Sequence, residues 1–239
     1  TLFFFNRPLV SELVARGFRV EIWCNTNLNM NVLGEIRSLG ATLRHFGMYR
    51  RPSLGSDIIT LFQIWRACLS IKPTAIVSLV PKAGLLASLA GFAGGISHRI
   101  HIFQGEVWYG KTGLYREFFR MVDYLTASLA THCLCVSNSE REFLVKNHVV
   151  GDAKLLVLGA GSICGVNIPQ TLRQEKKPNA SIGLLFVGRV ARDKGIFDLL
   201  AAFHVLLERG RDVALTIVGP LELPRELASR FKAICAGLG

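Results

Sequence analysis

Acidic residues are scarce in this chain, which has 17 Asp and Glu against 28 Lys and Arg and a formal net charge of +11. An excess of that size favours anionic partners, among them nucleic acid, phosphorylated metabolites and anionic lipid. The patterns that indicate nucleic-acid binding are missing: there is no zinc-finger spacing, no recognition-helix pattern and no stretch of interleaved basic and aromatic residues. We therefore expect a phosphorylated molecule or a lipid surface as partner, and no nucleic acid.

Patterns typical of metal and disulfide chemistry are missing too. The six cysteines form no Cys-x-x-Cys pair, and the chain has no Asp-x-Asp and no His/Cys cluster at ligand spacing. Most cysteines lie inside apolar runs, which predicts buried free thiols in a reducing compartment. We expect a cytoplasmic protein with no metal and no cofactor.

Long apolar runs are absent as well. The longest apolar stretch free of charge covers positions 83–97, and four glycines interrupt it. A membrane-spanning helix needs about 20 apolar residues. The sequence predicts no span, but its basic charge would suit a peripheral site on the inner face of the plasma membrane.

What the chain has in abundance is an alternation of strand and helix patterns. Strands such as Ala75–Leu79 are apolar on both faces, as in a parallel sheet covered by helices. The predicted strands are Arg19–Cys24, Thr42–Phe46, Ala75–Leu79, Arg99–Phe103, His132–Val136, Lys154–Leu158, Ile182–Val187 and Ala214–Val218. The predicted helices include Arg7–Arg16, Val32–Leu39, Asp57–Ser70, Lys82–Ala93, Leu114–Ala130, Ser139–Asn147 and Arg225–Ala236. This order predicts an α/β fold with doubly wound sheets.

The domain boundary is predicted from composition. Residues 169–180 are polar and bounded by prolines, which is typical of a linker. We expect one domain over 1–168 and a second over 181–239. The first domain lacks a strand before its first helix, and the second holds about two strands where a sheet usually has roughly 5–6. Both ends therefore look truncated, and the second domain incomplete.

The segment Phe186–Phe203 carries the strongest functional signal. Its strand ends at Gly188, and a loop containing Arg189 and Lys194 leads into an amphipathic helix. The free N–H groups of a helix start, the helix dipole and basic side chains all favour an anion. The segment is either an anion site or an ordinary solvated basic loop.

The segment Gly105–Thr112 matches the nucleotide-binding P-loop pattern Gly-x4-Gly-Lys-Thr, but other features of it argue against a P-loop. Glu106 would place a carboxylate beside the phosphates, and Trp108 is bulky for a loop that must wrap around them. No later strand ends in an Asp for Mg²⁺. The alternative is an acceptor-facing loop, in which Trp108 stacks on a sugar or touches lipid and Glu106 accepts a proton.

Three other polar side chains lie where α/β proteins bind ligands. Lys82 follows Pro81 at a helix start, and Asn25 follows a strand. Both would lie at the carboxyl edge of the sheet, as an acceptor contact or as ordinary surface and turn residues. His101 lies on the strand before the loop that begins at Gly105. It is either a core residue whose hydrogen bonds are made within the protein or a hydrogen-bond partner for a substrate sugar.

An ordered set of segments resembles the family 4 glycosyltransferases. The set comprises Pro8–Ile22, Pro81–Ala87, Phe103–Trp108, Leu158–Val166 and Gly188–Gly195. The resemblance implies a GT-B fold with two Rossmann-like domains, and a retaining transfer of a sugar from a UDP- or GDP-linked donor to an acceptor hydroxyl. It implies that Arg189 and Lys194 hold the donor diphosphate beside Gly188, that Gly161 belongs to the hinge on the donor side, and that His101 assists.

The branch of the family implies a lipid-linked or oligosaccharide acceptor in bacterial surface polysaccharide synthesis. The family's second domain carries two Glu residues eight apart, and this chain ends before such a pair. We therefore expect the chain as given to have little transferase activity. A P-loop nucleotidase and a non-catalytic sugar- or lipid-binding module are the alternatives.

Overall fold

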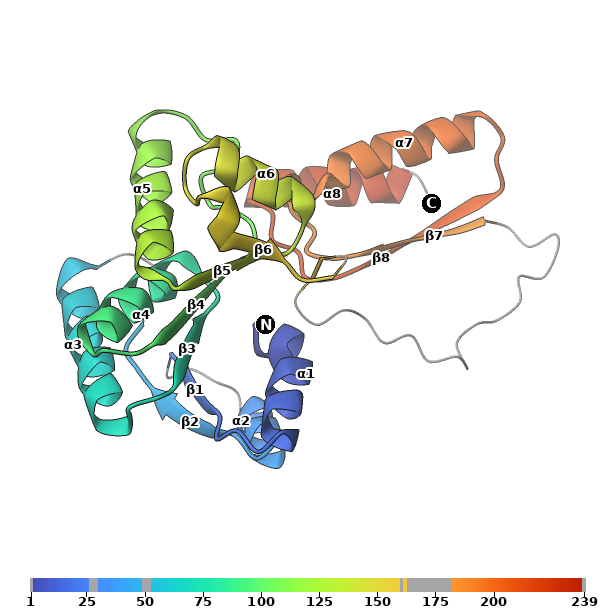
Figure 1. Ribbon diagram of the computed structural model, residues 1–239. Helices are drawn as coiled ribbons and strands as arrows, with labels where there is room; N and C mark the ends of the chain where they lie inside the picture. The colour runs from blue at the N-terminus through green and yellow to red at the C-terminus, as the bar shows by residue number, and fades with distance from the viewer. Residues whose placement is uncertain (1, 26–29, 49–52, 160, 163–181, 238–239) are drawn as a thin grey trace. The chain divides into compact units, whose positions relative to one another are not determined.

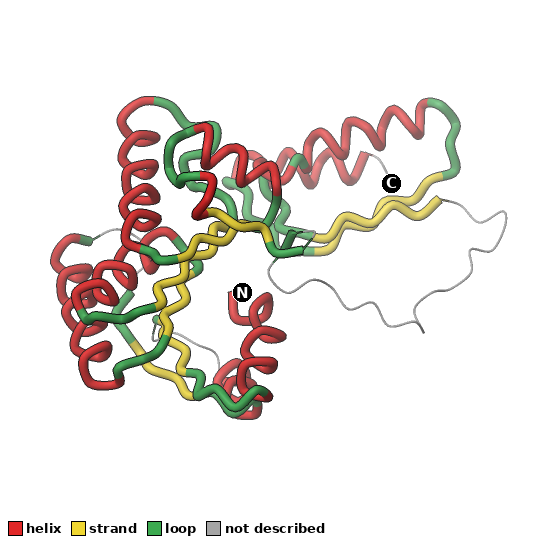
Figure 2. The backbone as a smooth tube through the Cα atoms, in the orientation of Figure 1, coloured by secondary structure: helices red, strands yellow, loops and turns green. Residues whose placement is uncertain are grey.

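The structure is a computed structural model that describes residues 2–25, 30–48, 53–159, 161–162 and 182–237. The chain divides into two compact units, residues 1–167 and 168–239. Each unit is an α/β unit with parallel strands (Figures 1 and 2). The expected linker 169–180 lies outside the described residues.

Unit 1 contains two parallel sheets. The smaller pairs β1 (Glu21–Cys24) with β2 (Thr42–His45). The larger has the order β3-β4-β5-β6, formed by β3 (Ala75–Ser78), β4 (His98–Phe103), β5 (His132–Cys135) and β6 (Leu155–Val157). In a doubly wound sheet of order 3-2-1-4-5-6, strand 1 lies in the middle and joins the strands on its two sides into one sheet. No described strand lies between β1–β2 and β3–β6, so they form separate ladders.

Helices alternate with these strands. They are α1 (Leu2–Ala15), α2 (Met30–Ser38), α3 (Leu54–Ile71), α4 (Pro81–Ala93), α5 (Gly113–Leu129) and α6 (Asn138–Lys146), and a short 3-10 turn η1 (Asp152–Lys154) precedes β6. Helix α4 packs on β3 and β4 between α3 and α5, and α6 packs on β5 and β6 (Figure 1). Pro81 occupies the first turn of α4, where a missing N–H costs nothing.

The apolar face of each element forms the core of unit 1. One cluster joins β5 and β6 to α5 and α6 through Cys133, Leu155, Ala127 and Leu144. A second cluster lies under α3 and α4, and a third lies around β1 and β2. The five described cysteines are free, and Cys68, Cys133 and Cys135 are buried.

Unit 2 is one βαβ unit with an added helix. Strands β7 (Ile182–Val187) and β8 (Val213–Val218) pair in parallel. A 3-10 turn, η3 (Arg192–Lys194), and helix α7 (Ile196–Glu208) connect the two strands. Helix α8 (Arg225–Gly237) follows β8. The sheet's inward side chains, among them Phe186 and Ile217, are half-buried, whereas Leu185 and Val187 on the other face are exposed.

Candidate functional site

The basic loop of unit 2 is tied to the loop after β8. A Cβ on Gly219 would lie 1.8 Å from the Gly188 carbonyl oxygen, so only glycine permits this approach. The Val190 N–H donates to Pro220 O at 2.8 Å, and Val190 O accepts from Glu222 N at 3.0 Å. Both loops follow carboxyl ends of parallel strands, which is the edge where α/β sheets bind ligands.

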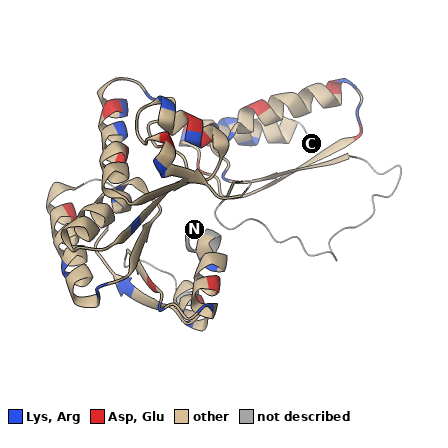
Figure 3. Cartoon of the chain, in the orientation of Figure 1, with Lys and Arg blue, Asp and Glu red and all other residues tan. Residues whose placement is uncertain are grey.

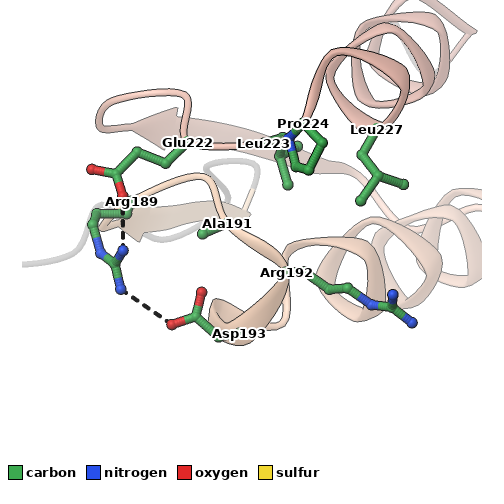
Figure 4. A pocket seen from close by; sticks show the side chains of 8 residues that line it. All are labelled: Arg189, Ala191, Arg192, Asp193, Glu222, Leu223, Pro224 and Leu227. Carbon is green, nitrogen blue, oxygen red and sulfur yellow. Dashed lines mark hydrogen bonds and ion pairs between the residues drawn. The ribbon is translucent and has the colours of Figure 1, made fainter. Parts of the chain in front are cut away.

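Arg189 is held by two carboxylates. Its Nη1 donates to Glu222 Oε2 at 2.8 Å and its Nη2 to Asp193 Oδ2 at 3.1 Å (Figure 4). These two partners raise the pKa of Arg189. The side chain remains about half exposed at 44%, so an incoming anion can reach the guanidinium while competing with Glu222 and Asp193.

A pocket of about 550 Å³ opens beside this ion-paired cluster. Charged side chains form one part of its lining and apolar side chains the other (Figure 4). The lining comprises Arg189, Ala191, Arg192, Asp193, Glu222, Leu223, Pro224 and Leu227. Lys194 is exposed at the end of η3. It lies two residues before α7. The N-cap of that helix is Gly195, which has a left-handed backbone conformation and supplies no side-chain acceptor for the first N–H groups of the helix.

A second, smaller pocket lies in unit 1, at the carboxyl ends of β3 and β4. Its volume is about 220 Å³. Leu79, Val80, Pro81, His101, Ile102, Phe103, Gln104, Gly105, Glu106, Val107 and Asp123 line it. It therefore contains two of the residues expected from the sequence, His101 and Glu106.

His101 is neutral and fixed in this pocket. Burial lowers its pKa to about 4, and its Nδ1 lies 2.8 Å from Ser78 Oγ. The ring fits only because residue 84 is glycine, since a Cβ there would lie 2.5 Å from His101 Cε1. A neutral imidazole can exchange hydrogen bonds with a ligand but carries no charge to bind phosphate.

Glu106, in the loop between β4 and α5, forms a carboxyl pair with Glu140 of α6. Burial, and then the negative charge of Glu140, raise the pKa of Glu106 to about 8. Glu140 accepts hydrogen bonds from the backbone N–H groups of Gly105 and Val136. Glu106 therefore holds its proton at neutral pH and becomes a base only near pH 8, which qualifies its expected role as a proton acceptor.

Trp108 lies in the core, which corrects the expectation that it faces an acceptor or lipid. It is 0% exposed, its Nε1 donates to Asp123 Oδ2 at 2.7 Å, and its ring packs on Phe143. Asp123, its hydrogen-bond partner on α5, is buried as well, at 1% exposed. Tyr109, the next residue, is the exposed aromatic of this loop at 70%.

The remaining expected residues are dispersed. Lys82 Nζ pairs with Asp57 Oδ1 at 2.5 Å at the start of α4. Asn25 is half-buried directly after β1. Gly161 adopts a φ of +102°, and a Cβ on it would lie 2.5 Å from Val136 O, so it packs closely on the loop before α6.

The 105–112 loop has the wrong geometry for a P-loop. The N–H of Tyr109 donates to Glu106 O at 3.0 Å and that of Lys111 to Trp108 O at 3.1 Å. The Trp108 side chain packs inward beneath this loop. A phosphate cradle needs N–H groups that point at the ligand, so the motif match at Gly105–Thr112 is not supported by the structure.

Among the described residues, no helix combines the length and the apolar character that a membrane span requires. Nor do these residues include a group of three or more His, Cys, Asp or Glu side chains placed to hold a metal ion.

Comparison with known proteins agrees with this geometry. The family model described as "Glycosyl transferase 4-like domain" matches residues 6–161, and the chain belongs to this family. The chain is 24% identical over 217 residues to the capsular polysaccharide biosynthesis glycosyltransferase CapM of Staphylococcus aureus, an alignment that covers 85% of this chain and 57% of CapM.

Solved structures show the same fold. HepE of Anabaena, crystallised with UDP-glucose, aligns with a TM-score of 0.65 at 14% identity, over 98% of this chain and 62% of HepE. The lipopolysaccharide outer core galactosyltransferase WaaB aligns with a TM-score of 0.62 at 15% identity, over 97% of this chain and 60% of WaaB. A UDP-GlcNAc 2-epimerase from Neisseria meningitidis, bound to UDP-GlcNAc, aligns with a TM-score of 0.58 at 16% identity, over 98% of this chain and 67% of the epimerase. The fold is thus the GT-B fold, with Rossmann-like units.

Proposed function

We propose that this chain is part of a glycosyltransferase that moves a sugar from a nucleoside diphosphate sugar to an acceptor hydroxyl in bacterial surface polysaccharide synthesis. The observation that carries the proposal is the pocket at Arg189, which combines exposed cations with an apolar wall and lies on the loop that leads into α7. Membership of the family and the likeness to CapM favour a transferase over an epimerase, although both enzyme classes share the fold.

The donor diphosphate is assigned to the start of α7. Arg189 and Lys194 would stabilise the negative charge that grows on the leaving diphosphate, and the dipole of α7 acts in the same direction. Positive side chains and a helix terminus replace a metal ion in this scheme. HepE and the epimerase were crystallised with uridine nucleotides, which supports UDP as the first donor to test. Retention of anomeric configuration follows from the resemblance to family 4.

The acceptor side is assigned to unit 1, with a lipid-linked or oligosaccharide acceptor as the substrate class. The CapM likeness supports a polysaccharide acceptor. A membrane-bound acceptor is supported by the net charge of +11 and by exposed apolar side chains along α5. The protein would then act from the cytoplasmic face of the membrane.

Calorimetry with UDP and GDP, without Mg²⁺, tests the donor assignment. Each charge-assisted hydrogen bond to phosphate is worth about 1.5–3 kcal/mol, so we expect Arg189→Ala/Lys194→Ala to weaken binding at least tenfold. The matched control is Arg209→Ala/Arg211→Ala, which removes the same charge at the far end of α7. Equal affinity in wild type and in the Arg189/Lys194 variant would disprove the assignment.

A further inference from the structure

The guanidinium of Arg189 is divided between two carboxylates. Its Nη1 donates to Glu222 Oε2 at 2.8 Å, and its Nη2 donates to Asp193 Oδ2 at 3.1 Å (Figure 4). Arginine binds phosphate most strongly through two parallel N–H bonds from one edge of the guanidinium. Because both terminal nitrogens already donate to carboxylates, a phosphate that approaches this pair of nitrogens competes with the carboxylates for them.

The two carboxylates differ in how they are held. Asp193 lies in η3, four residues after Arg189 in the same loop. Glu222 lies in the loop after β8, and its backbone N–H donates to Val190 O at 3.0 Å. Its side chain is about half exposed at 49%, and within the described part of the chain its one ion-pair partner is Arg189. The Glu222 carboxylate can therefore turn into solvent by side-chain rotation alone, without movement of the loop that carries it.

The charges that line the pocket of unit 2 cancel. Two cations, Arg189 and Arg192, stand against two carboxylates, Asp193 and Glu222. A surplus of positive charge favours a diphosphate, and the lining gains that surplus when the Glu222 carboxylate leaves. Exposed ion pairs contribute little net free energy because water screens them. A diphosphate that makes charge-assisted hydrogen bonds to the guanidinium can therefore replace this one.

We propose that Glu222 is the counterion of the donor site: its carboxylate holds the Arg189 guanidinium in place and is displaced from it by the donor diphosphate. The inference rests on the proposed glycosyl transfer, and it assigns Glu222 a role that the sequence did not suggest. Asp193 keeps its bond to Arg189 during the exchange, because both residues belong to one loop, and so keeps the guanidinium directed at the pocket.

A built-in competitor makes Glu222 a specificity-determining residue. Every anion that approaches Arg189 must replace the Glu222 carboxylate, so each anion binds more weakly than it would to an unpaired guanidinium. A small anion that makes few hydrogen bonds gains too little from the exchange. A nucleoside diphosphate has further groups that can contact the apolar part of the lining. The exchange therefore favours the donor over free phosphate or sulfate.

Calorimetric titration of the full chain with UDP and with inorganic pyrophosphate, in about 0.15 M salt and without Mg²⁺, tests the exchange. Glu222→Gln keeps the shape of the side chain and removes its charge. We expect this variant to bind both probes about two- to fivefold more tightly than wild type, which is the scale of an exposed ion pair.

Two further variants separate the contact with Arg189 from the general effect of charge. The gain in affinity should vanish when Glu222→Gln is combined with Arg189→Ala, because the carboxylate then has no guanidinium to occupy. Glu226→Gln, which is exposed in the first turn of α8, removes the same charge outside the pocket lining. This control should bind both probes as wild type does.

The sign of the change decides the inference. A Glu222→Gln variant that binds the probes no more tightly than wild type would overturn it, because a displaced counterion can only oppose binding. A gain that persists in the Arg189→Ala background, or an equal gain in Glu226→Gln, would overturn it as well, since either would reflect net charge alone. The proposed function is decided separately: it fails if Arg189→Ala/Lys194→Ala binds UDP as tightly as wild type, whatever Glu222→Gln does.

Discussion

At the scale of single residues, Glu106 is the group whose charge the fold changes most consequentially. Its pKa rises from an ordinary value of 4.5 to about 8. The folded protein therefore keeps a proton that the unfolded chain releases, and the free energy of unfolding falls as pH rises between these two values. Glu106→Gln has no proton to lose and should flatten this fall, by on the order of 1–2 kcal/mol after allowance for partial exposure.

Urea denaturation at about pH 5 and about pH 8 measures the effect, within the window that linkage defines. His101 complicates only the acid side, because its lowered pKa costs stability as pH falls from 6.5 to about 4. Glu142→Gln, exposed on α6, is the control and should keep the wild-type dependence. A Glu106→Gln variant whose stability still falls as steeply as wild type would show that Glu106 ionises normally.

Gly84 is a second residue whose role is purely local. A Cβ there would lie 2.5 Å from His101 Cε1 and 2.8 Å from His101 Nδ1. We expect Gly84→Ala to destabilise the protein by about 1–3 kcal/mol through overpacking, although alanine has the better helix propensity. Gly34→Ala in α2, with nothing within 4 Å of its Cβ, should instead stabilise by about 0.5–1 kcal/mol. Thermal unfolding of both variants separates crowding from propensity, and equal gains would contradict the account.

At the scale of elements, α6 carries a cap that also anchors a neighbouring loop. Ser137 Oγ accepts from Glu140 N at 3.1 Å, as in a capping box. The Glu140 carboxylate extends the motif, because it binds the N–H groups of Val136 and Gly105. Ser137→Ala should cost about 1 kcal/mol. Glu140→Ala should cost more, about 2–4 kcal/mol, because it leaves two backbone donors unpaired. Chemical denaturation ranks the two variants, and the reverse order would refute the anchoring role.

Helix α5 presents an apolar face that its own unit does not cover. Leu114 is 91% exposed and Phe118 is 59% exposed, and Met121 follows on the same helical face at 49%. We expect Leu114→Gln/Phe118→Gln/Met121→Gln to weaken binding to anionic phosphatidylglycerol vesicles more than tenfold, since each buried apolar side chain contributes about 1.5–3 kcal/mol.

The control for vesicle binding removes the same number of exposed apolar side chains elsewhere. Leu185, Val187 and Val218 lie on the open face of the β7–β8 sheet. Cosedimentation of the matching triple Gln variant should resemble wild type. If both variants lose binding equally, the association reflects general hydrophobicity rather than α5.

The sequence predicted the elements well because their signals are local. Pro81 marks the start of α4, and short apolar runs predict strands β3 to β8 to within about two residues. It missed the burial of Trp108, because that depends on Asp123 and Phe143 from two later helices. One available signal was the position of Asp123 on the same helical face as Ala127, which is buried.

At the scale of the whole molecule, the net charge of +11 produces a field that acts on any anion. Basic side chains occur on both units (Figure 3). Long-range attraction and direct contact respond differently to salt, because exposed charges further apart than a Debye length of about 8 Å are screened at 0.15 M ionic strength. The two contributions to UDP binding can therefore be separated by their salt dependence.

At low ionic strength we expect both double variants, Arg189→Ala/Lys194→Ala and Arg209→Ala/Arg211→Ala, to bind UDP more weakly than wild type, since each lowers the net charge by two. In about 0.15 M salt the second variant should recover wild-type affinity, whereas the first stays at least tenfold weaker because it has lost direct phosphate contacts. Calorimetric titrations at the two salt concentrations measure this. If salt abolished the difference for both variants, Arg189 and Lys194 would act only through the field, and the phosphate would have to be held by other groups at the start of α7.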